Sequence, residues 1–135
     1  MTIGLGIDLI DIARIEKALE RTPRFLERLY TEEEQALIAQ KGAQTAAGFF
    51  AAKEAVSKAL GTGLRGFSMR DIAVTEDELG CPHAVLTGGA LSRFNDIGGE
   101  RLTVSVTHAG GMAAAVAVID GQNPPVSKGE TNNGI

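Results

Sequence analysis

The segment from Phe50 to Gly63 places charged side chains inside a run that is otherwise built from small and apolar residues. At helical spacing Phe50, Glu54 and Lys58 lie on one face, and Gly61 readily adopts the left-handed conformation that ends a helix. A carboxylate and an ammonium group therefore lie one turn apart. Glu54 followed by Lys58 is also the favoured order for an ordinary surface ion pair. The alanine-rich surroundings instead favour the close approach of another backbone or of a ligand.

The length and composition are those of one globular domain. A chain of 135 residues fits a single core and is too short for two independent ones. It has no apolar stretch long enough to span a bilayer and no basic segment with a cleavage site at its start, so we expect a cytoplasmic protein without membrane contact. The net charge of -4 argues against a broad nucleic-acid surface. The single cysteine, Cys81, cannot form an internal disulfide, and no zinc-like ligand set accompanies it.

In the first half of the chain, periodicity and capping residues predict one strand followed by helices. Residues 3–10 form a buried strand in which Gly4 and Gly6 permit the close approach of another element. Asp11 is the expected N-cap of the first helix, and Thr22 with Pro23 restarts the chain as the cap and first turn of the next. A capping box at residues 31–34 opens a third helix. The long helix with the charged residues follows.

The second half of the chain is predicted to be mostly strand. We expect short strands over residues 71–75 and 84–87, a short helix over 89–94, and a hairpin. The hairpin joins strands over 102–107 and 113–119 through the turn that follows His108. Residues 120–135 are polar and are predicted to be a disordered tail, which limits the domain to residues 1–119.

Two carboxylates lie in apolar surroundings, Asp8 in the first strand and Glu54 in the long helix. A buried carboxylate without a partner is costly, so either each is satisfied separately or the two converge on one cation. Two carboxylates together with substrate phosphates and waters make up a usual Mg²⁺ site.

At these positions the chain resembles the holo-[acyl-carrier-protein] synthases, the small type of 4'-phosphopantetheinyl transferase. Three motifs carry the resemblance in this order along the chain: Gly6-Ile7-Asp8 with Arg14, Phe50-Ala51-Ala52-Lys53-Glu54-Ala55 with Lys58 and Gly61-Thr62-Gly63, and Ser105-Val106-Thr107-His108. The resemblance implies a single α+β domain with an antiparallel sheet and a long central helix. It also implies a homotrimer with each active site between neighbouring subunits.

The implied activity is Mg²⁺-dependent transfer of 4'-phosphopantetheine from coenzyme A to a serine of an apo acyl carrier protein, in fatty acid biosynthesis. Adenosine 3',5'-bisphosphate is the other product. By resemblance, Asp8 and Glu54 hold the metal against the pyrophosphate. Lys58 neutralises phosphate oxygens or assists proton transfer. The base for the serine proton is Glu54, a metal-bound water or hydroxide, or Lys58. Ser105 and His108 match the motif near the nucleotide part of coenzyme A.

Two further residues are candidates for contacts with coenzyme A. Lys53 either reaches a phosphate or is an outward-facing lysine. Gly63 lies in a turn that can bring backbone N–H groups near phosphate, although ending the helix also explains its glycines. Many family members carry an arginine where this chain has Phe49, and an acidic residue where it has Ala109. These departures predict weaker or altered contacts with the phosphates of coenzyme A.

A basic run follows the first strand and has two interpretations. Its members recur at steps of three or four: Arg14, Lys17, Arg21, Arg24 and Arg28. Acyl carrier proteins are acidic, so Arg14, Arg21 and Arg24 are candidates for docking such a partner. The alternative is a solvated face, because glutamates are interleaved with the basic residues. Arg14 is the member that matches the family's pattern.

Two other functions compete with the transferase. The first is a non-catalytic protein of the same fold that binds an acidic carrier protein. The second is an enzyme of another class that uses the magnesium site for a different nucleotide or phosphoester. The presence of Asp8, Glu54 and Lys58 together favours the transferase.

Overall fold

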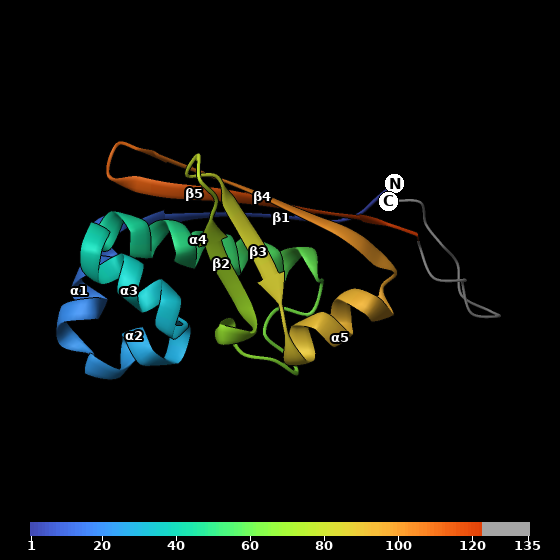
Figure 1. The fold of residues 1–135 in the computed structure, drawn as a ribbon, viewed down its shortest axis with the longest axis horizontal. Coiled ribbons are helices and arrows are strands. Elements are labelled where there is room, and N and C mark those ends of the chain that lie inside the picture. Colours follow the sequence, from blue (N-terminus) through green and yellow to red (C-terminus); the bar gives the residue numbers. More distant parts are fainter. Residues whose placement is uncertain (123–135) are drawn as a thin grey trace.

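A computed structural model, which describes residues 1–122, arranges one long helix beneath a sheet (Figure 1). The elements in chain order are β1 (Thr2–Asp11), α1 (Ile12–Arg21), α2 (Pro23–Leu29), α3 (Glu32–Lys41), α4 (Ala43–Ala59), the 3-10 helix η1 (Met69–Asp71), β2 (Ile72–Glu76), β3 (Pro82–Leu86), α5 (Gly88–Asp96), β4 (Gly99–Ala109) and β5 (Met112–Gly121). None of the helices in this part of the chain is long and apolar enough to cross a membrane.

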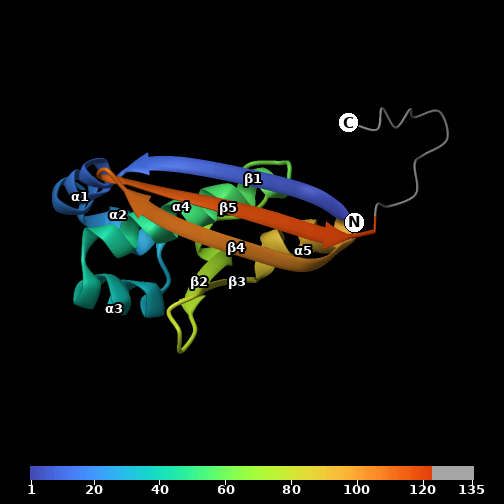
Figure 2. The same cartoon turned by 90° about the horizontal axis from the view of Figure 1, so that it is seen from above.

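The main sheet is antiparallel and has the strand order β1-β5-β4 (Figure 2). The predicted hairpin is β4–β5, and its turn contains Gly110 and Gly111 at φ 58° and 77°. Two successive residues with positive φ are what a two-residue hairpin turn requires. Strands β2 and β3 form a separate antiparallel pair. The predicted α+β fold, with an antiparallel sheet and a long helix, is therefore confirmed.

Helix α4 lies directly against β1, at the two glycines of that strand. A Cβ atom added to Gly6 would collide with the carbonyl oxygen of Ala55, and one added to Gly4 would collide with that of Ala59. The expected close approach is thus confirmed, and the approaching element is α4. The helix meets the strand with alanines, so backbone packs almost on backbone and the core beneath the sheet is thin.

The opposite face of the sheet is apolar and exposed. Leu5, Ile7 and Leu9 on β1 are 65%, 69% and 63% exposed. Their partners on β5 share the same face in register, with Ile7 opposite Val116 and Leu5 opposite Val118. Within residues 1–122, no helix or strand covers this outer face, as both views of the chain show.

The helices at one end of the sheet begin largely where capping residues predict. The Asp11 carboxylate accepts a hydrogen bond of 3.0 Å from the Ala13 N–H. Both bonds of the capping box between Thr31 and Glu34 are present. Pro23 occupies the first turn of α2, as predicted, but the Thr22 side chain makes no capping hydrogen bond. Thr22 is nevertheless the N-cap residue of α2, so its predicted position is confirmed.

The last strand runs past the predicted start of the tail at residue 120. Asp120 is in register with Thr2 and Arg101, and the Gly121 N–H donates to the Met1 carbonyl at 2.9 Å. The polar character of Asp120 concealed its place in the strand, because pairing on both sides holds its backbone. The remainder of the predicted tail, 123–135, lies outside the described residues.

Candidate active site

A pocket of about 420 Å³ contains both predicted metal ligands, and we call it the acidic pocket. Asp8 contributes from the inner face of β1, and Glu54 contributes from α4. Its lining residues are Asp8, Leu9, Ile10, Arg14, Ile15, Ala18, Phe25, Phe50 and Glu54. The rings of Phe25 and Phe50 stack with centroids 6.4 Å apart, which gives this charged pocket one aromatic wall. The pocket therefore combines two carboxylates, a guanidinium group and an apolar surface.

Lys58 pairs with Asp8 rather than with Glu54. Its ammonium lies 3.2 Å from Asp8 Oδ1 and donates to the Ile7 carbonyl at 2.9 Å. Burial raises the pKa of the Glu54 carboxyl, the negative charge of Asp8 raises it further, and Lys58 opposes the shift. The one-turn surface pair that the spacing allowed is thus not the observed arrangement. Two mutually repelling carboxylates face one opening, where a bound cation would relieve the repulsion.

This donor set fits Mg²⁺ when the substrate completes the coordination. Across residues 1–122, no three His, Cys, Asp or Glu side chains gather as a metal site. Mg²⁺ is commonly held by one or two protein carboxylates together with substrate phosphates and waters. Asp8 and Glu54 supply two such carboxylates, and burial, followed by the negative charge of Asp8, raises the pKa of the Glu54 carboxyl.

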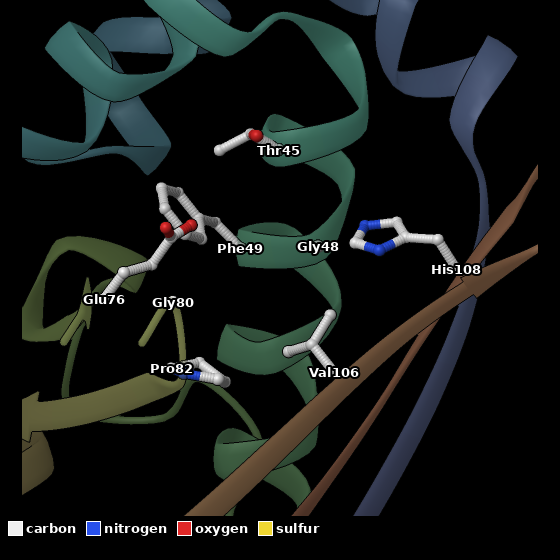
Figure 3. A pocket seen from close by; sticks show the side chains of 8 residues that line it. All are labelled: Thr45, Gly48, Phe49, Glu76, Gly80, Pro82, Val106 and His108. Atoms are coloured by element: carbon white, nitrogen blue, oxygen red, sulfur yellow. The ribbon is translucent and has the colours of Figure 1, made fainter. Parts of the chain in front are cut away.

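A second pocket of about 210 Å³ contains His108, and we call it the histidine pocket (Figure 3). It lies between α4, β4 and the β2–β3 hairpin, and it is lined by Thr45, Gly48, Phe49, Glu76, Gly80, Pro82, Val106 and His108. The His108 Nε2 lies 3.0 Å from the carbonyl oxygen of Gln44. A carbonyl only accepts, so Nε2 carries the hydrogen in this contact. Gly48 leaves room for the ring, since a Cβ there would lie 3.0 Å from Nε2.

The histidine pocket has the carboxylate of Glu76 on one wall and the apolar side chain of Phe49 on another. Phe49 is almost fully buried, with an exposed fraction of 4%. Glu76 pairs with Lys41 across 2.8 Å. His108 is thus the one basic side chain among the residues that line this pocket.

The two pockets share no lining residue and open on different sides of α4. Phe50 and Glu54 face the acidic pocket, whereas Gly48 and Phe49 face the histidine pocket. Ser105 belongs to neither. It is in register with Val116 on the outer face of the sheet, whereas His108, three residues further along β4, is on the inner face. One chain therefore does not bring Ser105 and His108 together.

Lys53 is a buried structural residue and lies in neither pocket. Its ammonium lies 2.9 Å from Glu34 Oε1 and donates to the carbonyl oxygens of Met69 and Ile72 at 2.9 and 2.6 Å. The side chain has no exposed surface. Three acceptors use all three donors of the ammonium, so the predicted contact of Lys53 with a phosphate is wrong for this arrangement. The sequence predicts Glu34 as a capping residue, but only the packing of α3 on α4 reveals that it also pairs with Lys53.

The remaining predicted residues lie on the surface. Gly63 is in the exposed loop after α4 at φ 61°. Arg14 lines the acidic pocket and, with Lys17 and Arg21, also a shallow groove of about 400 Å³ along α1. Arg24 is exposed on α2. The basic side chains of α1 thus begin at the edge of the acidic pocket and extend away from it.

Comparison with known proteins decides the family. Residues 4–116 match the profile described as the 4'-phosphopantetheinyl transferase superfamily. The chain belongs to this superfamily. The holo-[acyl-carrier-protein] synthase of Clostridium novyi is 45% identical over 125 residues, which are 91% of this chain and 91% of that protein. The synthase of Treponema denticola is 44% identical and covers 90% of this chain over its full length.

Solved structures of holo-[acyl-carrier-protein] synthases share this transferase fold. The Helicobacter pylori synthase in complex with coenzyme A superposes with a TM-score of 0.77 at 38% identity, over 86% of this chain and 99% of that one. The Bacillus anthracis synthase, in a complex described as coenzyme A (3',5'-ADP), gives 0.75 at 35% identity, over 90% and 99%. The resemblance stated from the sequence motifs is therefore confirmed.

Proposed function

We propose that this chain is a holo-[acyl-carrier-protein] synthase that transfers 4'-phosphopantetheine from coenzyme A to a serine of an apo acyl carrier protein. The observation that carries the proposal is the acidic pocket. There Asp8 and Glu54, from two different elements, face one opening beside Arg14. Family membership supplies the reaction, and the pocket supplies the groups that such a reaction needs.

In this reaction the serine oxygen bonds to the phosphorus that carries the pantetheine. The bond from that phosphorus to the bridging oxygen breaks, and adenosine 3',5'-bisphosphate leaves. Mg²⁺ held by Asp8 and Glu54 would neutralise the pyrophosphate charge. Lys58, which is paired with Asp8 and half exposed, would offset charge on phosphate oxygens. Glu54 and Lys58 are the side chains that could accept the serine proton, and a bound Mg²⁺ would supply a water or hydroxide as the third candidate.

The nucleotide part of coenzyme A is proposed to bind at the histidine pocket. His108 offers an imidazole that can bond phosphate or adenine groups, and Phe49 and Pro82 offer apolar surface. With Phe49 in place of a basic residue, phosphate contacts there rest on His108. We therefore expect weaker affinity for the nucleotide phosphates, and we expect transfer activity to be retained.

A homotrimer with active sites between subunits is the proposed assembly. The exposed apolar outer face of the sheet is a suitable contact between copies of the chain. The acidic and histidine pockets open on different sides of α4. A ligand that contacts both is therefore proposed to take the acidic pocket from one subunit and the histidine pocket from its neighbour. Ser105, on the outer face, would then lie near a neighbour.

The proposed docking surface for the acidic carrier protein is the basic side of α1 and α2. Arg14 stands at the rim of the acidic pocket, Arg21 lies further along the α1 groove, and Arg24 follows on α2. Electrostatic attraction would bring the partner's serine toward the carboxylates. No nucleic-acid partner is proposed, and the cytoplasmic location expected from the sequence stays a prediction.

Intact mass spectrometry of an apo acyl carrier protein tests the function directly. The carrier is incubated with this protein, coenzyme A and Mg²⁺, and a parallel sample contains EDTA. We expect a gain of one phosphopantetheine group that depends on the metal. An unchanged carrier mass despite confirmed binding would favour the non-catalytic binding protein. Binding of a different nucleotide with Mg²⁺, but not of coenzyme A, would favour the enzyme of another class.

A further inference from the structure

We propose that the buried ion pair between Lys53 and Glu34 positions Glu54, by fixing the rotation of α4 about its own axis. The inference rests on the proposed function, because it takes Glu54 as a ligand of Mg²⁺. Lys53 and Glu34 are therefore positioning residues, and neither touches a substrate.

The ammonium of Lys53 is held from three directions. Glu34 Oε1 lies 2.9 Å away on α3, the Met69 carbonyl 2.9 Å away on η1, and the Ile72 carbonyl 2.6 Å away at the start of β2. The Tyr30 ring lies 5.9 Å from the same nitrogen. A side chain with no exposed surface and every donor occupied has one position, so the turn of α4 that carries it has one orientation.

Glu34 is anchored as firmly as its partner. Its Oε1 accepts from the Thr31 N–H at 2.8 Å, and its Oε2 accepts from the Val74 N–H at 2.6 Å. The carboxylate therefore joins the start of α3 to β2 and to α4 at once. Its exposed fraction is 1%. The ion pair is fixed to the scaffold on both sides.

The other side chains that α4 buries are mostly small or apolar, and apolar packing has no bond direction of its own. Against β1 the helix presents Ala55 and Ala59 to Gly4 and Gly6, a close contact that contains no side-chain hydrogen bond. Successive helical residues are about 100° apart around the axis. Fixing Lys53 in the interior therefore directs Glu54, the next residue, toward Asp8 and the acidic pocket.

The energetics of buried ion pairs favour a directional role over a purely stabilising one. An apolar pair of the same size often gives equal or greater stability, whereas removal of one partner leaves a costly unpaired charge. Stability and orientation can therefore be separated by comparing a single with a double substitution.

The test compares Lys53→Met, the double variant Lys53→Met/Glu34→Gln and Ile38→Ala. Ile38 is a buried apolar residue of α3, the helix that carries Glu34. Its truncation therefore destabilises α3 without removing either partner of the Lys53–Glu34 ion pair. Urea unfolding reports stability. Calorimetry reports coenzyme A binding at a series of Mg²⁺ concentrations, and transfer assays give the Mg²⁺ concentration for half-maximal rate.

We expect Lys53→Met to raise the Mg²⁺ requirement about tenfold or more, as is usual when a group that orients a metal ligand is lost. The double variant should regain part of the stability, because no unpaired charge remains although the Met69 and Ile72 carbonyls lose their donor, and it should keep the raised requirement. Ile38→Ala should lose stability with the Mg²⁺ requirement unchanged. If Lys53→Met does not fold, the double variant, which has no unpaired buried charge, carries the same comparison.

The inference is overturned if the Mg²⁺ requirement returns to normal together with stability in the double variant. It is equally overturned if Ile38→Ala shifts that requirement as much as Lys53→Met does. Glu54→Ala separates this inference from the proposed function. If coenzyme A binding depends on Mg²⁺ as before in Glu54→Ala, the metal role of Glu54 fails; if only the Lys53 variants behave normally, the positioning role alone fails.

Discussion

Among single residues, Glu54 is the one whose proposed function opposes the stability of the fold. Burial and the charge of Asp8 raise the pKa of its carboxyl above the ordinary value of 4.5. The folded state then binds the proton more tightly than the unfolded state does. Stability is therefore lost as the pH rises through the folded-state pKa, and this loss is absent well below 4.5, where both states are protonated.

Glu54→Gln should accordingly melt at a higher temperature than the unmodified chain near neutral pH in the absence of metal. The amide is neutral, so it avoids the repulsion from Asp8, and the difference in melting temperature should shrink in acid. Transfer activity should be lost in the same variant. Thermal unfolding followed by circular dichroism at several pH values measures the effect. An equal difference in melting temperature at every pH would mean that ionisation of Glu54 is not its cause.

Sequence reasoning at this scale succeeded where the partners are local or belong to a motif. Phe50 and Glu54, four residues apart, line one pocket as their spacing predicts. The buried position of Lys53 was not predictable in this way, because its partners Glu34, Met69 and Ile72 come from three separate segments. Spacing along one helix carries no information about which side of it another helix will cover.

Between elements, the contact of β1 with α4 depends on the absence of side chains at Gly4 and Gly6. Gly6→Ala should destabilise the fold by about 3 kcal/mol or more, because the added methyl meets the backbone oxygen of Ala55 and α4 must lift from the strand. Gly110→Ala is the control. Its Cβ meets nothing within 4 Å, so only the strain of its positive φ remains, about 1 kcal/mol. Urea denaturation measures both, and equal losses would show that the helix adjusts freely.

The basic side of α1 is the element on which carrier-protein docking is proposed. Arg14→Glu should raise the KM for the carrier protein by about tenfold or more and leave the KM for coenzyme A much less affected, since the charge steers the acidic partner. Arg101→Glu on β4 makes the same charge change at the opposite end of the sheet (Figure 2). Steady-state kinetics at two salt concentrations distinguish them. Equal effects of Arg14→Glu on both substrates would remove the docking role.

The elements themselves were predictable to the extent that their signals are local. The capping box at Thr31 and the glycines after His108 placed a helix start and a hairpin turn. The order β1-β5-β4 and the separate β2–β3 sheet depend on contacts between distant segments. Asp120 shows the limit at a boundary, because a polar residue joins a strand once neighbours on both sides pair with its backbone.

For the whole molecule, the exposed outer face of the sheet predicts self-association. Val116 lies on the central strand β5, between Ile7 and Ser105 on its two neighbours. Val116→Lys should convert the proposed trimer to monomers and abolish transfer, because a buried unpaired ammonium is not tolerated in an apolar contact. Val85→Lys on β3, where the valine is 52% exposed, should change neither property. Light scattering after size-exclusion chromatography gives the mass, and a trimer that persists in Val116→Lys would place the contact elsewhere.

The separation of the two pockets by α4 leads to a test of where a complete site is formed. If Glu54 of one subunit works with His108 of its neighbour, two defective chains can complement each other. Glu54→Ala and His108→Ala chains, refolded together in equal amounts, should form trimers in which about a quarter of the interfaces carry both intact residues. Transfer measured at a coenzyme A concentration far below the KM of His108→Ala should then return to about a quarter of the unmodified rate. Each variant refolded alone is the control. If the mixture is no more active than the two controls together, each site is complete within one chain, and the acidic and histidine pockets must then be reached by one ligand passing around α4.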